Sequence, residues 1–231
     1  MIEFIFLDLD DTILDFRWAE HQAITRTMLK FDVEPTEALC ERYRQINWEC
    51  WLKLERGEIT REELQVSRFR QLQQELELEG DPLTFADTYI QYLSEGHCFL
   101  PGAEETLHTL AKQYRLFLAT NGIAQVQYGR LESAGITQCF EKLFISQEMG
   151  VYKPHREFFE RCFEAIPGFC KERAIMVGDS LNSDMQGGIQ AGILTCWMNP
   201  SQRPECDGIH PDYQIESLPQ LLPVLKTLDL L

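Results

Sequence analysis

The sequence lacks the features that mark membrane, secreted or zinc-binding proteins. No apolar run approaches the roughly 20 residues that a membrane-spanning helix needs. The N-terminus, Met1-Ile2-Glu3-Phe4, has neither the basic region nor the cleavage site of a signal peptide. None of the eight cysteines belongs to a C-x-x-C pair or to a Cys/His cluster with zinc spacing. We therefore expect a cytoplasmic protein without a membrane partner, whose cysteines, Cys206 included, are free thiols.

Basic residues are also scarce. The chain has 21 Lys and Arg against 37 Asp and Glu, which gives a formal net charge of −16. Such a chain cannot neutralise the backbone of a nucleic-acid polymer, so we exclude that class of partner. A small anionic substrate would still need a local positive field, from a metal ion, a lysine or helix N-termini.

Short apolar segments alternate with helical ones over much of the chain. The segment 2–7 is nearly continuously apolar, as expected for a central strand of a parallel sheet covered on both faces. Further strands are predicted at 115–120, 142–145, 174–177 and 194–197, and helices at 104–113, 124–134, 157–165 and 182–191. This alternation predicts an α/β fold with a doubly wound, Rossmann-like parallel sheet.

The stretch 15–96 has a different pattern, with helical periodicity throughout. Thr60 and Glu63 have the spacing of a capping box, so a helix should begin at Arg61. One strand precedes this stretch and several follow it. We therefore predict an α/β core domain formed by residues 1–14 and 97–231, interrupted by a four-helix cap domain at 15–96.

Two polar motifs directly follow predicted strands, at the edge where open α/β sheets bind ligands. Asp8 and Asp10 follow the first strand, where one carboxylate can serve as nucleophile and the other as general acid and base. The T-N-G segment 120–122 combines a hydroxyl, a glycine and a helix N-terminus. Those are the parts of a phosphate-binding turn.

Two further motifs offer a cation and metal ligands. Lys153 precedes Pro154, which fixes the backbone near a helix start, and its ammonium can neutralise a phosphate oxygen. After the strand A-I-M-V, Asp179 and Asp184 are hard oxygen ligands of the kind that Mg²⁺ takes.

Each motif also has an ordinary structural explanation. The Asp8 motif can be a solvated acidic turn, the T-N-G segment a capped strand-to-helix turn, Lys153 a surface side chain and Asp179 a helix cap. All four occur in this order at predicted strand ends, and together they supply every part that metal-assisted phosphoryl transfer requires. We therefore favour a single active site over four coincidences.

These motifs resemble those of the haloacid dehalogenase-like hydrolase superfamily, and the resemblance covers essentially the whole chain. The matching segments are F-L-D-L-D-D-T-I-L, L-A-T-N-G, S-Q-E-M-G-V-Y-K-P and V-G-D-S-L-N-S-D. The helical insertion is similar to the four-helix cap of that superfamily. Members that cleave carbon–halogen bonds lack the carboxylate at the position of Asp10, so the resemblance is to the phosphatase branch.

The resemblance implies a role for each motif. Asp8 would form an aspartyl-phosphate, and Asp10 would protonate the leaving group and then activate water. A Mg²⁺ cofactor would be held by Asp8, Asp179, Asp184 and the backbone carbonyl of Asp10. The transferring phosphate would be bound by Asp8, Thr120, Lys153 and the backbone N–H groups near Leu9, Asp10 and Asn121.

A finer resemblance concerns the substrate. The segments I-N-W-E-C-W, R-G-E-I-T, K-P-H-R-E-F-F and G-I-L-T-C-W-M-N are similar to those of bacterial pyrimidine 5′-nucleotidases. That resemblance implies a nucleoside monophosphate as the small phosphate-ester substrate. Possible substrate contacts near or within the cap are Phe16, Asn47, Trp51 and Arg68. The alternative is that Trp48 and Trp51 fill the bundle core and that Arg68 is a solvated surface residue.

Three other functions remain open from the sequence. The enzyme can be a phosphatase of sugar phosphates or phosphoglycolate, or a phosphomutase that passes the phosphoryl group to a bound sugar. It can also be a catalytically silent protein that binds a ligand or partner through its cap.

Overall fold

The computed structural model of the protein describes residues 1–205 and 208–229. The chain forms two compact units, one made of residues 1–16 and 97–231 and the other of residues 17–96. Each unit is described by itself below. The thiol of Cys206 lies outside the described residues.

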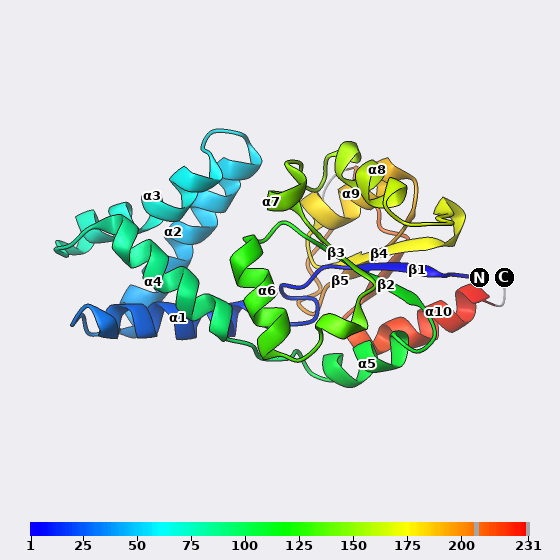
Figure 1. Cartoon of the computed structure of the whole chain (residues 1–231), viewed down its shortest axis with the longest axis horizontal. Helices are drawn as coiled ribbons and strands as arrows, with labels where there is room; N and C mark the ends of the chain where they lie inside the picture. The colour runs from blue at the N-terminus through cyan, green and yellow to red at the C-terminus, as the bar shows by residue number, and fades with distance from the viewer. Residues whose placement is uncertain (206–207, 230–231) are drawn as a thin grey trace. The chain divides into compact units, whose positions relative to one another are not determined.

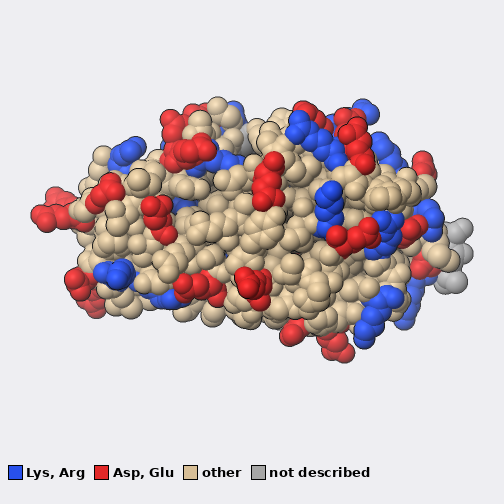
Figure 2. Space-filling view, viewed as in Figure 1, with Lys and Arg blue, Asp and Glu red and all other residues tan. Residues whose placement is uncertain are grey.

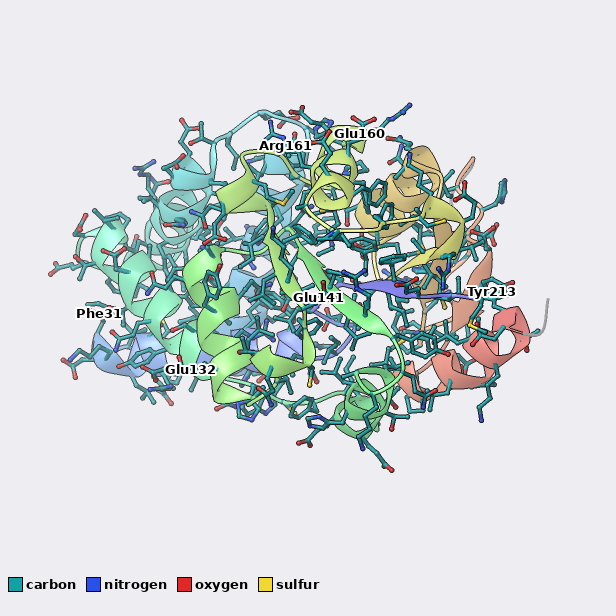
Figure 3. All side chains as sticks on the ribbon, turned by 45° about the vertical axis from the view of Figure 1, so that its right-hand side comes forward. Phe31, Glu132, Glu141, Glu160, Arg161 and Tyr213 are labelled. Atoms are coloured by element: carbon teal, nitrogen blue, oxygen red, sulfur yellow. The ribbon has the colours of Figure 1, made fainter. Side chains whose placement is uncertain are left out.

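A six-stranded parallel sheet forms the centre of the first unit (Figure 1). Its strand order is β3-β2-β1-β4-β5-β6, so the first strand of the chain pairs on one side with β2 and on the other with β4. The strands are β1 (Phe4–Leu7), β2 (Arg115–Thr120), β3 (Lys142–Ile145), β4 (Ala174–Gly178), β5 (Leu194–Met198) and β6 (Tyr213–Ile215). The predicted doubly wound parallel sheet is confirmed, and β6 is an additional edge strand that begins at Tyr213 (Figure 3).

The side chains of β1 alternate between two hydrophobic layers, as the pleat of a strand requires. Phe4 and Phe6 pack on one face with the phenylalanines of α8 (Arg156–Glu164). Ile5 and Leu7 pack on the other face with leucines of α5 (Ala103–Leu110) and α10 (Leu221–Asp229). Both faces of the sheet are therefore covered, and polar groups can reach ligands mainly at the strand ends.

The remaining helices of this unit are short. They are α6 (Ala124–Ser133), α7 (Ser146–Met149), α9 (Gln186–Ala191), a π-helical turn (Leu181–Met185) and 3₁₀ turns at Thr137–Cys139, Lys171–Arg173 and Leu218–Gln220. The helix predicted at 182–191 is thus a π-helical turn followed by an α-helix. It ends, as predicted, at Gly192, whose φ of 76° favours a residue without a Cβ.

The second unit contains the helices α1 (Phe16–Lys30), α2 (Glu37–Glu55), α3 (Arg61–Leu76) and α4 (Pro82–Glu95), except that Phe16, the first residue of α1, belongs to the first unit. The predicted capping box is confirmed, since Thr60 and Glu63 satisfy each other's backbone N–H at the start of α3. Between the helices, Tyr43, Phe69 and Tyr89 pack with ring centroids 5.1–5.5 Å apart. Phe31, labelled in Figure 3, stacks on Phe85 with the two ring centroids 3.8 Å apart.

The sequence offered the alternative that Trp48 fills the core and that Arg68 is exposed, and the structure shows the opposite for both side chains. Trp48 is 63% exposed, because it lies about 200° around α2 from the buried Ile46. Arg68 is only 1% exposed, because Asn47 accepts a hydrogen bond from it and its guanidinium lies 4.7 Å from the Tyr89 ring centroid. Trp48 is therefore not a core residue, and Arg68 is not a surface residue.

Charged side chains of both signs lie on the surface, and the described cysteines are unpaired, as the sequence predicted for the thiols. Acidic and basic side chains are interspersed on the face shown in Figure 2. The seven cysteines of the described residues are free thiols. Within 1–205 and 208–229, no helix combines the length and apolar character that crossing a membrane requires.

Candidate active site

The carboxyl ends of three adjacent strands bring the predicted motifs together. Asp8 directly follows β1, Thr120 is the last residue of β2, and Asp179 directly follows β4. Because β1 lies between β2 and β4, these residues occupy one edge of the sheet. The side chains of Asp8 and Thr120 are buried, and Asp179 is half-buried.

Lys153 joins these strand ends although it comes from the loop after α7. Its side chain is 1% exposed, and its ammonium donates to Asp8 Oδ1 at 3.0 Å and Asp184 Oδ1 at 2.6 Å. A third bond reaches the carbonyl of Ala119 at 2.6 Å. All three ammonium hydrogens are thus used, which fixes the position of the charge.

Asn121 holds the backbone of Lys153 in place. Its side-chain carbonyl accepts from the Lys153 N–H at 3.0 Å, and its amide donates to the Lys153 carbonyl at 2.9 Å. The Lys153–Pro154 peptide bond is cis. The T-N-G turn therefore connects the β2 end to the lysine loop by a pair of hydrogen bonds.

Asp8, Asp179 and Asp184 form an acidic trio, in which one carboxylate oxygen of each residue lies within 4.8 Å of the others. Burial raises the pKa of Asp8 to about 7, against the opposing effect of Lys153. Burial and then repulsion from Asp184 and Asp8 raise the pKa of Asp179 well above its ordinary value. Burial alone would lower the pKa of Lys153, but Asp184 and Asp8 raise it.

The trio fits a small divalent cation. Asp8 and Asp184 pair with the buried Lys153 ammonium, and the third carboxylate, Asp179, lies 4.0 Å from the exposed Arg203 guanidinium. Raised carboxyl pKa values mean that negative charge at this position is costly without further compensation. Clustered carboxylate oxygens are the ligands that Mg²⁺ prefers. These residues can therefore hold such an ion.

The position of Asp184 depends on a glycine. Gly178 ends β4, and a Cβ at this position would overlap the Asp184 side chain. Ser180 N–H donates to Asp184 Oδ2 at 3.1 Å, so the carboxylate has little room to move away.

We predict that Gly178→Ala destabilises the protein by about 1–3 kcal/mol through overpacking. Urea unfolding monitored by circular dichroism would measure the change. Gly96→Ala is the matched control, because a Cβ there meets its nearest atom at an ordinary 3.7 Å. Equal unfolding midpoints for the two variants would contradict the steric argument.

Asp10 faces helix α6. One carboxylate oxygen forms an ion pair with the buried Arg130, and the other accepts from the Gln127 side-chain amide at 2.8 Å. Leu9, between the two aspartates, has its side chain in the core, so only its backbone can serve the site. Sequence reasoning missed Gln127 and Arg130, although their spacing of three residues on one helix face, directly after T-N-G, was a usable signal.

The candidate substrate contacts are divided between the two units, and each is described within its own unit. Phe16 is half-buried in the first unit, 5.7 Å from the Arg130 guanidinium carbon. In the second unit, Asn47 is buried, donates to Glu20 at 2.6 Å and accepts from Arg68 at 2.8 Å. Trp51 is half-buried on α2.

Fold and site together define an α/β protein with a buried, lysine-paired acidic centre at the carboxyl edge of a parallel sheet. Residues 2–192 match the haloacid dehalogenase-like hydrolase family. The chain belongs to this family, and the prediction of an enzyme that is a hydrolase is confirmed.

Several bacterial proteins are similar to this chain over nearly its whole length. The chain is 37% identical to the HAD-hydrolase YfnB of Bacillus subtilis, covering 96% of this chain and 94% of that protein. A crystal structure of YfnB bound to magnesium matches with a TM-score of 0.92, covering 97% of this chain and 98% of that one. The pyrimidine 5′-nucleotidases PynA of Streptococcus pneumoniae and YjjG of Escherichia coli are 37% and 33% identical. The match to PynA covers 96% of this chain and 94% of PynA, and the match to YjjG covers 95% of this chain and 96% of YjjG.

Proposed function

We propose that this protein is a Mg²⁺-dependent phosphate monoester hydrolase that forms an aspartyl-phosphate on Asp8 and acts on pyrimidine nucleoside monophosphates. The observation that carries this proposal is the buried Asp8 carboxylate, held by Lys153 beside Asp179 and Asp184. The nucleotidase names of two full-length relatives support the choice of substrate.

The chain's own groups would hold the metal ion. Asp8, Asp179 and Asp184 are the side-chain ligands that we propose, together with the backbone carbonyl of Asp10. When bound, Mg²⁺ supplies positive charge that offsets the repulsion between the Asp8 carboxylate and an anionic phosphate. The magnesium-bound structure of YfnB supports this choice of ion.

In the first step, an Asp8 oxygen attacks phosphorus and the bond from phosphorus to the ester oxygen breaks. Asp10 gives its proton to that oxygen, so the product leaves as an alcohol. Asp10 is suited to this role because it is two residues further along the same loop and its side chain is 26% exposed, open to a leaving group.

In the second step, water hydrolyses the aspartyl-phosphate. The Asp10 carboxylate takes a proton from the water, the water oxygen bonds to phosphorus, and the bond from phosphorus to Asp8 breaks. Inorganic phosphate is released and both carboxylates return to their starting states. One residue thus serves as acid and then as base.

Positive and N–H groups would bind the phosphoryl oxygens. We propose that the Lys153 ammonium attracts these oxygens by its charge. The Thr120 hydroxyl and the backbone N–H groups of Leu9, Asp10 and Asn121 would donate hydrogen bonds to them. Such fixed donors provide most of the rate enhancement in phosphoryl transfer.

Substrate selection is assigned to the second unit and the residue that leads into it. Phe16 and Trp51 offer aromatic faces for a base or sugar. Arg68 has two guanidinium nitrogens, Nε and Nη2, without a hydrogen-bond partner among the described residues, and their hydrogens suit the carbonyl oxygens of a pyrimidine. Asn47 accepts from the third nitrogen and would position the guanidinium.

The test is phosphate release with Mg²⁺ from a panel of pyrimidine and purine nucleoside monophosphates, sugar phosphates and phosphoglycolate. We expect the highest kcat/KM for dUMP, UMP or dTMP, and no release after chelation with EDTA. No sugar bisphosphate is added, so release of free phosphate also distinguishes hydrolysis from a phosphomutase.

A preference for sugar phosphates or phosphoglycolate would overturn the substrate assignment and leave the chemistry in place. Absence of release from every ester would contradict the hydrolase assignment and favour a protein that only binds its ligand.

A further inference from the structure

Gln127 connects two groups of the proposed active site. It lies on α6, is fully buried, and its amide nitrogen donates to Asp10 Oδ2 and to the Thr120 hydroxyl oxygen, both at 2.8 Å. Arg130, also fully buried and three residues further along the helix, pairs with Asp10 Oδ1. A single helix therefore holds both oxygens of Asp10 and one side of Thr120.

The orientation of the Gln127 amide follows from its partners. Asp10 Oδ2 accepts in the ionised carboxylate and also when Oδ1 carries the proton of the first step, so the nitrogen and not the oxygen of Gln127 faces it. The amide oxygen is buried and has no hydrogen-bond partner among the described residues. A buried carbonyl without a partner is unfavourable. This unfavourable burial of the amide oxygen accompanies an orientation in which both amide hydrogens bond to site residues.

The hydrogen bonds already made by Thr120 leave its hydroxyl free only to donate. The oxygen accepts from Gly122 N–H at 3.0 Å and from the Gln127 amide at 2.8 Å. A hydroxyl has two acceptor positions and one hydrogen, so only donation remains. A phosphate dianion offers acceptors alone and therefore requires that hydrogen.

Gly122 leaves the space that the Gln127 side chain occupies. A Cβ at this position would overlap the Gln127 side chain. The glycine of the T-N-G turn thus makes room for the amide that orients the hydroxyl two residues before it.

We propose that Gln127 is a positioning residue that makes the Thr120 hydroxyl a donor toward phosphate and, together with Arg130, orients Asp10 toward the leaving group. The inference rests on the roles of Asp10 and Thr120 in the proposed function. Gln127 itself touches neither reacting atom and acts through these two residues.

The experiment compares two esters in the wild type and in Gln127→Met, a replacement of similar length without hydrogen-bonding groups. The esters are dUMP, whose alkoxide leaving group needs a proton, and 4-nitrophenyl phosphate, whose phenolate leaves with little help. We expect kcat/KM to fall about 100-fold for dUMP and about 10-fold for the aryl ester. The inhibition constant of inorganic phosphate should rise at least 5-fold, because the Thr120 donor is no longer fixed.

Arg130→Lys separates the two functions of this helix. It should lower kcat/KM for dUMP more than for the aryl ester, and it should leave phosphate inhibition within about 2-fold. Gln127→Asn, which keeps the amide one methylene further back, should be intermediate. Gln125→Met is the matched control, because Gln125 lies exposed on the same helix, and should match the wild type.

Partial unfolding cannot imitate this result, because the ratio between two esters does not depend on the fraction of folded enzyme. Equal losses for both esters in Gln127→Met, with unchanged phosphate inhibition, would overturn the inference and assign Gln127 a structural role. Inactivity of the wild type on both esters would instead overturn the proposed function, and this inference with it.

Discussion

Replacing Asp8 by asparagine is expected to abolish phosphate release while leaving the protein folded. The amide is a poor nucleophile and cannot form the aspartyl-phosphate, so kcat should fall by about 10⁴-fold or more. Release of phosphate from dUMP in the presence of Mg²⁺ measures the loss. Asp87→Asn, an exposed aspartate on α4, is the control and should keep full activity.

The same substitution is expected to stabilise the metal-free protein. Asp8 has its pKa raised from 3.8 to about 7, chiefly by burial, so its charged form is disfavoured in the folded state. A neutral amide of the same shape removes that penalty. With about 1.4 kcal/mol for each pKa unit, the gain is at most about 4 kcal/mol.

The sign of the pH dependence follows from the raised pKa. Below pH 3.8 the carboxyl is protonated in both the folded and the unfolded state, so wild type and Asp8→Asn should be equally stable. Between that pH and about 7 the unfolded chain ionises while the folded protein keeps its proton, and the wild type loses stability. Above about 7 the difference should be constant.

Urea unfolding in EDTA at several pH values measures this difference. Substantial turnover by Asp8→Asn would contradict the nucleophile assignment. A difference in stability that shrinks as the pH rises would contradict the burial argument, and the two outcomes are independent.

The central part of the fold was predictable because its signals are local and strong. Continuous apolar runs form β1 and β4, which are buried on both faces, and a parallel sheet places their carboxyl ends at one edge. That geometry alone brings Asp8 and Asp179 together. The strand β6 was missed because it has three residues, one of them the exposed Gln214, and this is too short for a period of two to emerge.

Tertiary contacts explain why the burial of three polar side chains was not predicted. A polar residue on a helix normally marks the solvent-facing side, so Gln127 and Arg130 look exposed in a helical projection. They are buried because Asp10 and Thr120, which come from other segments, supply their partners. The alternative that made Arg68 a solvated surface residue was wrong for the same reason, since its partner Asn47 lies on a different helix.

Lys153→Met is expected to have the second large effect, on both stability and activity. The buried ammonium has hydrogen bonds of 2.6–3.0 Å to two carboxylates and one carbonyl. Its removal leaves these buried acceptors without their cation, which should cost about 3–5 kcal/mol of unfolding free energy. Phosphoryl oxygens lose a proposed partner as well, so kcat/KM should fall by about 10³-fold.

The measurement is urea unfolding with and without Mg²⁺, alongside kcat/KM for dUMP. Mg²⁺ should restore part of the stability of Lys153→Met, because an ion that binds only the folded state stabilises it. Lys142→Met is the control, since Lys142 is exposed at the start of β3 and should cost less than about 1 kcal/mol.

Combining the two substitutions distinguishes a charge effect from a packing effect. If Lys153 stabilises the fold by compensating buried carboxylates, its loss should matter less once Asp8 is neutral. The double variant Asp8→Asn/Lys153→Met should therefore be more stable in EDTA at pH 8 than Lys153→Met alone. A double-mutant cycle should give a coupling energy of about 1–3 kcal/mol. Strict additivity would mean that the lysine stem, and not its charge, supports the site, and Lys153 would then lose its proposed role in balancing the acidic trio.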